Sequence, residues 1–120
     1  GYYDSIKLID LAKLVKEKLS LDGVRVIGDP NKLINKAGVV GGSGSSELYI
    51  AKSQGCDCLI TGEMRLNKAI EAKQIDLAVI EVNHGVERFV FDDLVNEFNE
   101  EFKNIKFIVS CINTDPLYYV

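Results

Sequence analysis

The side chains best suited to chemistry lie around the single histidine of the chain, His84. Glu87 follows three positions later, so a helix that begins near Gly85 would place the imidazole and the carboxylate on one face. Both groups bind divalent metal ions, although two ligands alone do not hold a metal. An exposed or helix-capping histidine beside a surface glutamate is the competing interpretation, and the spacing taken alone favours it.

A second candidate is the glycine- and serine-rich run at residues 41–46. Such a run ahead of a helix offers backbone N–H groups to a phosphate or carboxylate. It lacks the lysine of a Walker loop and the third glycine of a dinucleotide fingerprint, and Glu47 would repel an anion. The alternative is a tight turn in which Ser45 or Ser46 caps the next helix. The residues that could contact a substrate here are Gly42, Ser43, Gly44 and Ser45.

Two further candidates, Thr61 and Glu63, close a short apolar run ahead of a helical segment. Glu63 could act as a base or as a carboxylate that supports a metal ligand, whereas a helix-capping or solvated role accounts for it equally well. Cys56 and Cys58 could form a metal-thiolate site, but Cys58 opens an apolar run and the sequence has no second cysteine pair. We therefore expect buried packing roles for both cysteines.

These candidates lie in a chain that alternates strand-like and helix-like segments. Apolar residues recur at helical spacing over residues 6–19, where Asp4 or Ser5 is the expected cap. Two successive strand-helix crossovers favour parallel strands, whose carboxyl ends meet at one edge where ligands usually bind. Further helices are expected over residues 48–54, around 68–72 and over 91–102, and strands over 24–27, 37–40, 58–61, 77–81 and 105–111.

This alternation predicts an α/β fold with a mixed, mainly parallel sheet flanked by helices, as a single domain over residues 1–120. With 120 residues, 47% of them hydrophobic, the chain can form one core. The formal net charge of -4 and the scattering of 14 Lys and Arg residues argue against direct nucleic-acid binding. Because no apolar run approaches the roughly 20 residues that span a bilayer, and three cysteines do not make a disulfide framework, we expect a cytoplasmic protein without a membrane segment.

Four short segments of the sequence, taken together in their order along the chain, identify a protein family more specifically than any one of them. Together they resemble the GTP cyclohydrolase I type 2 family, also called the Nif-three-like family. The likeness covers almost the whole chain and corresponds to the second, C-terminal half of a family member. It implies an α/β half-domain that faces a first half across a dinuclear metal site, in proteins that commonly form ring-shaped hexamers. The segments are residues 41–46, 58–63, 80–84 with Glu87, and 114–117.

The resemblance carries metal-ligand roles over to His84 and Glu87 only. The family usually has a glycine before this histidine and the glutamate four residues after it, whereas this chain has Asn83 and a spacing of three residues. Family members often carry a further histidine at the position of Asn67. The resemblance implies two divalent ions (zinc, iron, manganese or nickel) in the full-length protein.

Two functions follow as expectations. The first is a metal-dependent hydrolase, with a small nucleotide as its expected substrate, that is incomplete without the first half of the family protein. Glu63, Thr61 and the run at residues 41–46 would then surround the metal ligands or the substrate. The alternative is a non-catalytic oligomerisation or partner-binding module whose metal loop has degenerated, which the changes at Asn83 and Asn67 motivate.

Overall fold

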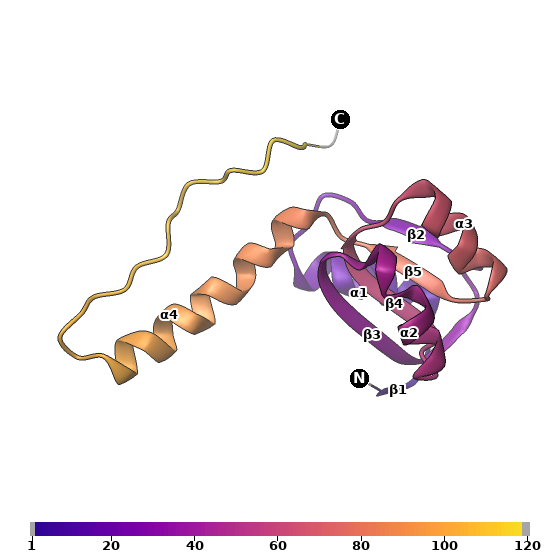
Figure 1. The fold of residues 1–120 in the computed structure, drawn as a ribbon, viewed down its shortest axis with the longest axis horizontal. Helices are drawn as coiled ribbons and strands as arrows, with labels where there is room; N and C mark the ends of the chain where they lie inside the picture. Colours follow the sequence, from indigo (N-terminus) through magenta and orange to yellow (C-terminus); the bar gives the residue numbers. More distant parts are fainter. Residues whose placement is uncertain (1, 119–120) are drawn as a thin grey trace.

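The computed structural model describes residues 2–118 and shows one five-stranded mixed sheet with helices on both faces (Figure 1). The strand order is β1-β3-β4-β5-β2. The strands are β1 (Tyr2–Lys7), β2 (Arg25–Ile27), β3 (Leu33–Ser43), β4 (Cys58–Glu63) and β5 (Ala78–Glu81). The helices are α1 (Leu8–Lys18), α2 (Leu48–Ser53), α3 (Leu66–Gln74) and α4 (Val90–Glu101), with two short 3-10 helices, η1 (Gly44–Ser46) and η2 (His84–Phe89).

The centre of the sheet is parallel, as the sequence predicts. β4 pairs in parallel with β3 on one side and with β5 on the other, while the outer strands β1 and β2 pair antiparallel. Val40 lies opposite Thr61, and Thr61 lies opposite Glu81, so the three parallel strands end at the same edge. The predicted α/β class with a mixed, mainly parallel sheet is confirmed.

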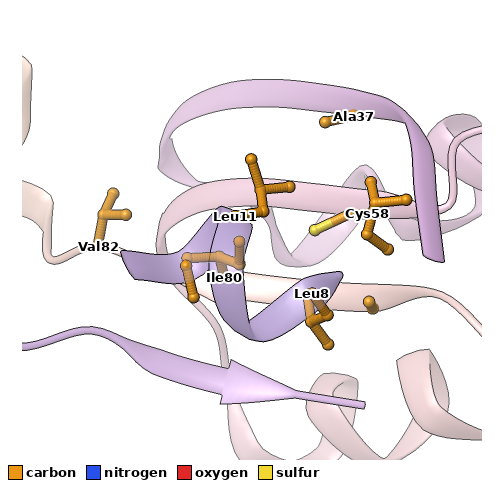
Figure 2. Close-up of a cluster of buried hydrophobic side chains, with 9 residues drawn as sticks. Leu8, Leu11, Ala37, Cys58, Ile80 and Val82 are labelled. Carbon is orange, nitrogen blue, oxygen red and sulfur yellow. The ribbon is translucent and has the colours of Figure 1, made fainter. Parts of the chain in front are cut away.

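The core lies on both faces of this sheet, because side chains of a strand alternate between its faces. Figure 2 shows one face, where Leu8 and Leu11 of α1 belong to the same buried cluster as Ile80 of β5. On the other face, Leu48 of α2 and Ala72 of α3 share a cluster with residues of β4 and β5. Strands buried on both faces read as continuous apolar runs, which is why the sequence signalled β4 and β5 clearly.

The start of the chain differs from the prediction. Residues 2–7 form β1, so the helix begins at Leu8 and its N-cap is Lys7, without a side-chain cap. Asp4 and Ser5 are therefore wrong as caps. The physical reason is strand pairing: Ile6 lies opposite Ile34 in β3, and the Ser5 hydroxyl donates a hydrogen bond to Asn35 Oδ1 at 2.6 Å. An apolar residue at helical spacing was in fact a strand residue.

Two other predicted segments need correction. The strand expected over residues 37–40 is longer, since β3 runs from Leu33 through the glycines to Ser43. The strand expected over residues 105–111 is absent from the described part of the chain, where this segment is extended but unpaired. It turns back from the end of α4 (Figure 1). Asn99 of α4 accepts a hydrogen bond from Phe107 N at 2.9 Å and donates one to Phe107 O at 2.9 Å, so a side chain replaces a strand partner.

The remaining predicted elements are confirmed to within a few residues. They include the helices over residues 48–54, 68–72 and 91–102 and the strands over 24–27, 58–61 and 77–81. Helix α4 extends away from the sheet, and the following segment returns beside it (Figure 1). Over residues 2–118, none of the helices has both the length and the apolar character needed to cross a bilayer.

Candidate functional site

Three strand ends bring the predicted site residues to one edge of the sheet. Ser43 at the end of β3 lies opposite Glu63 at the end of β4, and the chain leaves β5 at Glu81 just before His84. The convergence arises from the parallel pairing of the three strands, because parallel strands present their carboxyl ends together. The structure thus brings together residues that are 20 to 41 positions apart in the chain.

His84 and Glu87 lie on one turn of η2 and approach each other closely. His84 Nε2 is 3.2 Å from Glu87 Oε2, and both side chains are about half exposed. Ligand atoms bind zinc and similar ions at about 2.0–2.2 Å, so two donors separated by this distance can belong to one coordination sphere. The prediction that His84 and Glu87 share one face is confirmed.

Glu63 contacts the other nitrogen of the same imidazole. Its Oε1 lies 3.7 Å from His84 Nδ1, a distance longer than a hydrogen bond but short enough for electrostatic attraction. A carboxylate on this side favours a proton on Nδ1 and leaves Nε2 for a ligand, as partners of metal-bound histidines do. Glu63 therefore lies where a supporting carboxylate would be needed, on the side of the ring away from Glu87.

The glycines of β3 pack directly against this pair. A Cβ on Gly42 would lie 3.0 Å from Glu87 Oε1 and 3.6 Å from His84 Nε2, and a Cβ on Gly41 would lie 3.2 Å from Glu87 Oε1. Gly42 also has a φ of +58°, a conformation that favours glycine. The run at residues 41–46 thus provides space for the His84–Glu87 pair.

Gly62 is held even more tightly. A Cβ there would lie 2.7 Å from the carbonyl oxygen of Gly42 and 3.2 Å from the Cα of His84. The backbones of β3, β4 and the His84 turn therefore meet at distances that only glycine permits. This contact sets the position of His84 relative to β3.

Thr61 joins the glycine run to β4 from inside the core. Its side chain is 1% exposed, its hydroxyl accepts a hydrogen bond from Gly44 N at 2.8 Å, and it donates one to Gly42 O at 3.1 Å. The N–H of Gly44 is therefore used within the protein rather than directed at an anion. Thr61 is a structural support for the loop.

The serines of this run do not cap α2. The N-cap of α2 is Glu47, which makes no side-chain cap, so the prediction for Ser45 or Ser46 is wrong. Ser45 is buried and its hydroxyl accepts a hydrogen bond from Arg65 N at 3.1 Å, while Ser46 donates to Glu47 Oε1 at 3.0 Å. Both serines lie within η1, and Glu47 stands between that turn and α2, which explains the difference.

Asn83 has a backbone conformation that glycine adopts more easily, with φ at +75° and ψ at 145°. Its side chain compensates: Nδ2 donates to Asp115 Oδ2 at 2.8 Å, and Oδ1 accepts from Gly85 N at 3.4 Å. The resemblance places a glycine here, and this geometry gives the reason. Asp115 was not predicted as a site residue, although it lies in one of the four segments that carry the resemblance.

The described residues provide only part of a metal site. Among residues 2–118, no group of three or more His, Cys, Asp and Glu side chains could hold a metal ion. The His84–Glu87 pair fits as part of a site, with two convergent donors in a glycine-lined space. Glu63 faces the opposite ring nitrogen, so it does not add a third donor on the Nε2 side.

The cysteines take no part in this edge. Cys56 and Cys58 are both buried, which confirms the packing role expected for them. Burial raises the pKa of the Cys58 thiol to about 12, so it stays protonated and is a poor metal ligand at neutral pH.

A cavity of about 590 Å³ lies beside His84 at this edge. Its walls include Arg25 and Arg65, together with Leu117 and Tyr118 from the end of the described chain. Arg25 forms an ion pair with the largely buried Glu81. Sequence reasoning missed both arginines, because neither belongs to a recognisable motif and they come together only when β2 pairs with β5.

Comparison with known proteins identifies the family of this chain. A sequence model of Duf34/NIF3 (NGG1p interacting factor 3) matches residues 1–116. The chain belongs to the Duf34/NIF3 family. A "GTP cyclohydrolase 1 type 2 homolog" of Staphylococcus aureus (strain MSSA476) is 36% identical over 121 residues, which cover 98% of this chain and 33% of that protein.

Solved structures of NIF3-related proteins have the same fold. A Bacillus cereus protein related to NIF3 superimposes with a TM-score of 0.95 at 29% identity, covering 100% of this chain and 35% of the other. A Staphylococcus aureus hypothetical protein gives 0.90 at 35% identity, covering 99% of this chain and 41% of the other. The predicted family is confirmed, and the chain spans about a third of the length of the curated relatives it matches.

Proposed function

We propose that this chain contributes His84 and Glu87 to a dinuclear metal site in a NIF3 family protein that carries out metal-assisted hydrolysis. The observation that supports this most directly is the convergence of His84 Nε2 and Glu87 Oε2, 3.2 Å apart, in a glycine-lined space. The other ligands would come from the parts of the longer family proteins that this chain does not span. The chain alone would therefore be inactive.

Each residue of the site would have a distinct part in this function. Divalent cations bound there would polarise a substrate oxygen and lower the pKa of a bound water. His84 would offer Nε2 to the ion, Glu87 would add negative charge, and Glu63 would orient the imidazole from the Nδ1 side. Zinc, iron, manganese and nickel all accept this pair of donors. A small nucleotide is the proposed substrate, because the relatives are named as homologues of a GTP cyclohydrolase.

Metal titration of the chain tests the proposal. We expect calorimetry with Zn²⁺ and Mn²⁺ to show weak binding that the His84→Ala, Glu87→Ala double variant loses by about tenfold or more. Glu97→Ala, which removes an exposed carboxylate from α4, is the matched control and should bind as the wild type does. Equal metal affinity in the wild type and the double variant would reject the assignment.

A second candidate function is a non-catalytic, homo-oligomeric assembly module, and the surface of the molecule motivates it. The arm, defined as α4 with residues 102–114, exposes large apolar side chains such as Ile108 (76%) and Ile112 (75%). Exposed apolar surface of this kind is typical of protein–protein contacts. Elemental analysis separates the two functions, since only the first requires bound metal.

Sedimentation of the chain tests the assembly module. We expect self-association in the micromolar range that an Ile108→Ser, Ile112→Ser variant weakens. The control is the Lys13→Ser, Lys16→Ser variant, which places two serines on the exposed surface of α1, away from the arm. A monomer throughout this concentration range would count against the module.

A further inference from the structure

The cavity beside His84 has a charge distribution that the proposed metal site does not explain. Four charged side chains line it: Arg25, Glu63, Arg65 and Glu81. Glu81 is paired with Arg25, and Glu63 faces His84 Nδ1. Among residues 2–118, the Arg65 guanidinium has no ion-pair partner. One positive charge in the wall is therefore left available to a ligand.

The position of Arg65 is well defined by its backbone. Its N–H donates a hydrogen bond to the buried Ser45 hydroxyl at 3.1 Å, and the preceding Met64 is buried. Arg65 is also the N-cap residue of the nine-residue helix α3 and makes no side-chain cap, so the positive end of that helix lies beside it. A guanidinium with five N–H donors binds phosphate or carboxylate oxygens in pairs, which a lysine cannot do.

The end of the described chain supplies a different kind of wall. Leu117 and Tyr118 line the cavity, although both side chains are largely exposed. Their backbone is held there by Asp115, whose Oδ1 accepts from Leu117 N at 2.9 Å and whose Oδ2 accepts from Asn83 Nδ2 at 2.8 Å. A flat apolar ligand can stack on an exposed aromatic ring and contact the apolar side chain beside it, which buries the apolar surface of both.

From these two walls we propose that the cavity binds a small molecule in which an oxyanion, phosphate or carboxylate, is joined to a flat ring. Arg65 binds the oxyanion, and Tyr118 with Leu117 contacts the ring. A volume of about 590 Å³ is in the range of small-molecule sites. The ligand would lie beside His84, so its role as a substrate rests on the proposed function. Binding of the ligand to Arg65 and Tyr118 requires no metal.

Titration of phenyl phosphate into the full chain in the presence of EDTA tests this inference. Phenyl phosphate should bind about tenfold more tightly than inorganic phosphate or phenol, measured by calorimetry and by amide shifts near Arg65 and Tyr118. Benzoate in place of phenyl phosphate distinguishes a carboxylate site from a phosphate site. Arg65→Gln should weaken phenyl phosphate binding by about tenfold, and Arg65→Lys should restore part of it.

Two variants separate the roles of the walls. Tyr118→Ala should remove the advantage of phenyl phosphate over inorganic phosphate and leave phosphate binding unchanged. Arg88→Gln removes an exposed arginine that is not part of this cavity and should bind as the wild type does. Equal losses in Arg65→Gln and Arg88→Gln, or equal affinity for phenyl phosphate and phosphate in the wild type, would overturn the proposal.

Failure of this inference can be distinguished from failure of the metal site. Ligand binding is measured without metal, so it does not depend on whether His84 and Glu87 bind an ion. Conversely, Arg65→Gln should keep the metal affinity of the wild type, because Arg65 is not one of the proposed metal ligands. A metal site without ligand binding in EDTA would reject only the role of Arg65 and Tyr118.

Discussion

The sheet edge around His84 and the arm are organised in opposite ways. At the edge, backbones approach so closely that a Cβ on Gly62 would lie 2.7 Å from a carbonyl oxygen, and Thr61 is 1% exposed. Within the described residues, α4 buries none of its side chains, and Ile112 is 75% exposed. The edge is therefore shaped by contacts within this chain, whereas the apolar surface of the arm becomes useful only when something covers it.

This difference has a consequence for mutations. Substitutions at the edge should change both the stability of the fold and the geometry of the site, because the same contacts serve both. Substitutions in the arm should leave the fold almost unchanged and alter association instead. Variants of the edge and of the arm should therefore differ in what they change.

The largest effect is expected for Gly62→Ala. The new methyl group would lie 2.7 Å from Gly42 O and 3.2 Å from His84 Cα, so β3 and the His84 turn must move apart. We expect the free energy of unfolding to fall by about 3 kcal/mol. Urea denaturation measures it, and the metal affinity proposed for His84 should fall as well.

Gly55→Ala is the control for this change. Gly55 has a φ of +73°, and a Cβ added there would have no other atom within 4 Å. Its substitution therefore measures backbone strain without steric contact. A loss of about 1 kcal/mol is expected there. If the two variants lose the same stability, close packing is not what shapes the edge.

Thr61→Val should have the next largest effect. Valine keeps the shape of the side chain but removes the two hydrogen bonds with Gly44 N and Gly42 O. Because the group is buried, we expect a loss of about 2 kcal/mol in the free energy of unfolding. Thermal melting measures it, with the exposed Thr114→Val as control. An equal effect at Thr114 would remove the distinction between edge and arm.

Asp57 gives a pH-dependent test of the sheet. Burial by itself would raise the pKa of Asp57, but the backbone N–H groups of Asn35 and Lys36 donate to its carboxylate and bring the pKa below the ordinary value of 3.8. A carboxyl group with a lowered folded-state pKa stabilises the fold above its ordinary pKa, and this contribution is lost as the pH falls through the folded-state value. Asp57→Asn should reduce stability at neutral pH by about 1 kcal/mol.

The measurement for Asp57 is acid unfolding followed by circular dichroism. The variant should lose less stability than the wild type between neutral pH and acid, because one of the groups that must be protonated is gone. Asp92→Asn in the arm is the control, and it should leave the acid transition unchanged. A wild-type acid transition in Asp57→Asn would show that this carboxylate does not support the start of β3.

The smallest effect concerns thiol accessibility, which compares the two regions without changing the protein. Cys111 lies in the arm and is exposed, whereas Cys58 is buried in the core with its pKa raised to about 12. A thiol reagent should modify Cys111 quickly and Cys58 only on unfolding. Mass spectrometry of the modified chain shows the order. Fast modification of Cys58 would mean that the core opens more readily than its packing indicates.

Sequence reasoning was successful where the signal is local. The apolar runs of β4 and β5 and the helical periodicity of α4 predicted those elements, and the spacing of His84 and Glu87 predicted their shared face. The same reasoning failed at Ile6, whose helical spacing concealed a strand, and at residues 105–111, whose apolar alternation has no partner strand in the described chain. Both failures concern pairing, which composition and periodicity do not encode.

The sequence by itself determined the order of strands and helices from α1 to α4, the parallel centre of the sheet, the family and the one turn that carries both proposed metal ligands. Only the tertiary structure decided that Glu63 faces the second imidazole nitrogen, that Asp115 supports Asn83, and that Arg65 and Tyr118 share a cavity. The reason is distance along the chain. Local patterns follow from backbone geometry within a few residues, whereas these contacts join segments that meet only once the strands have paired in the sheet.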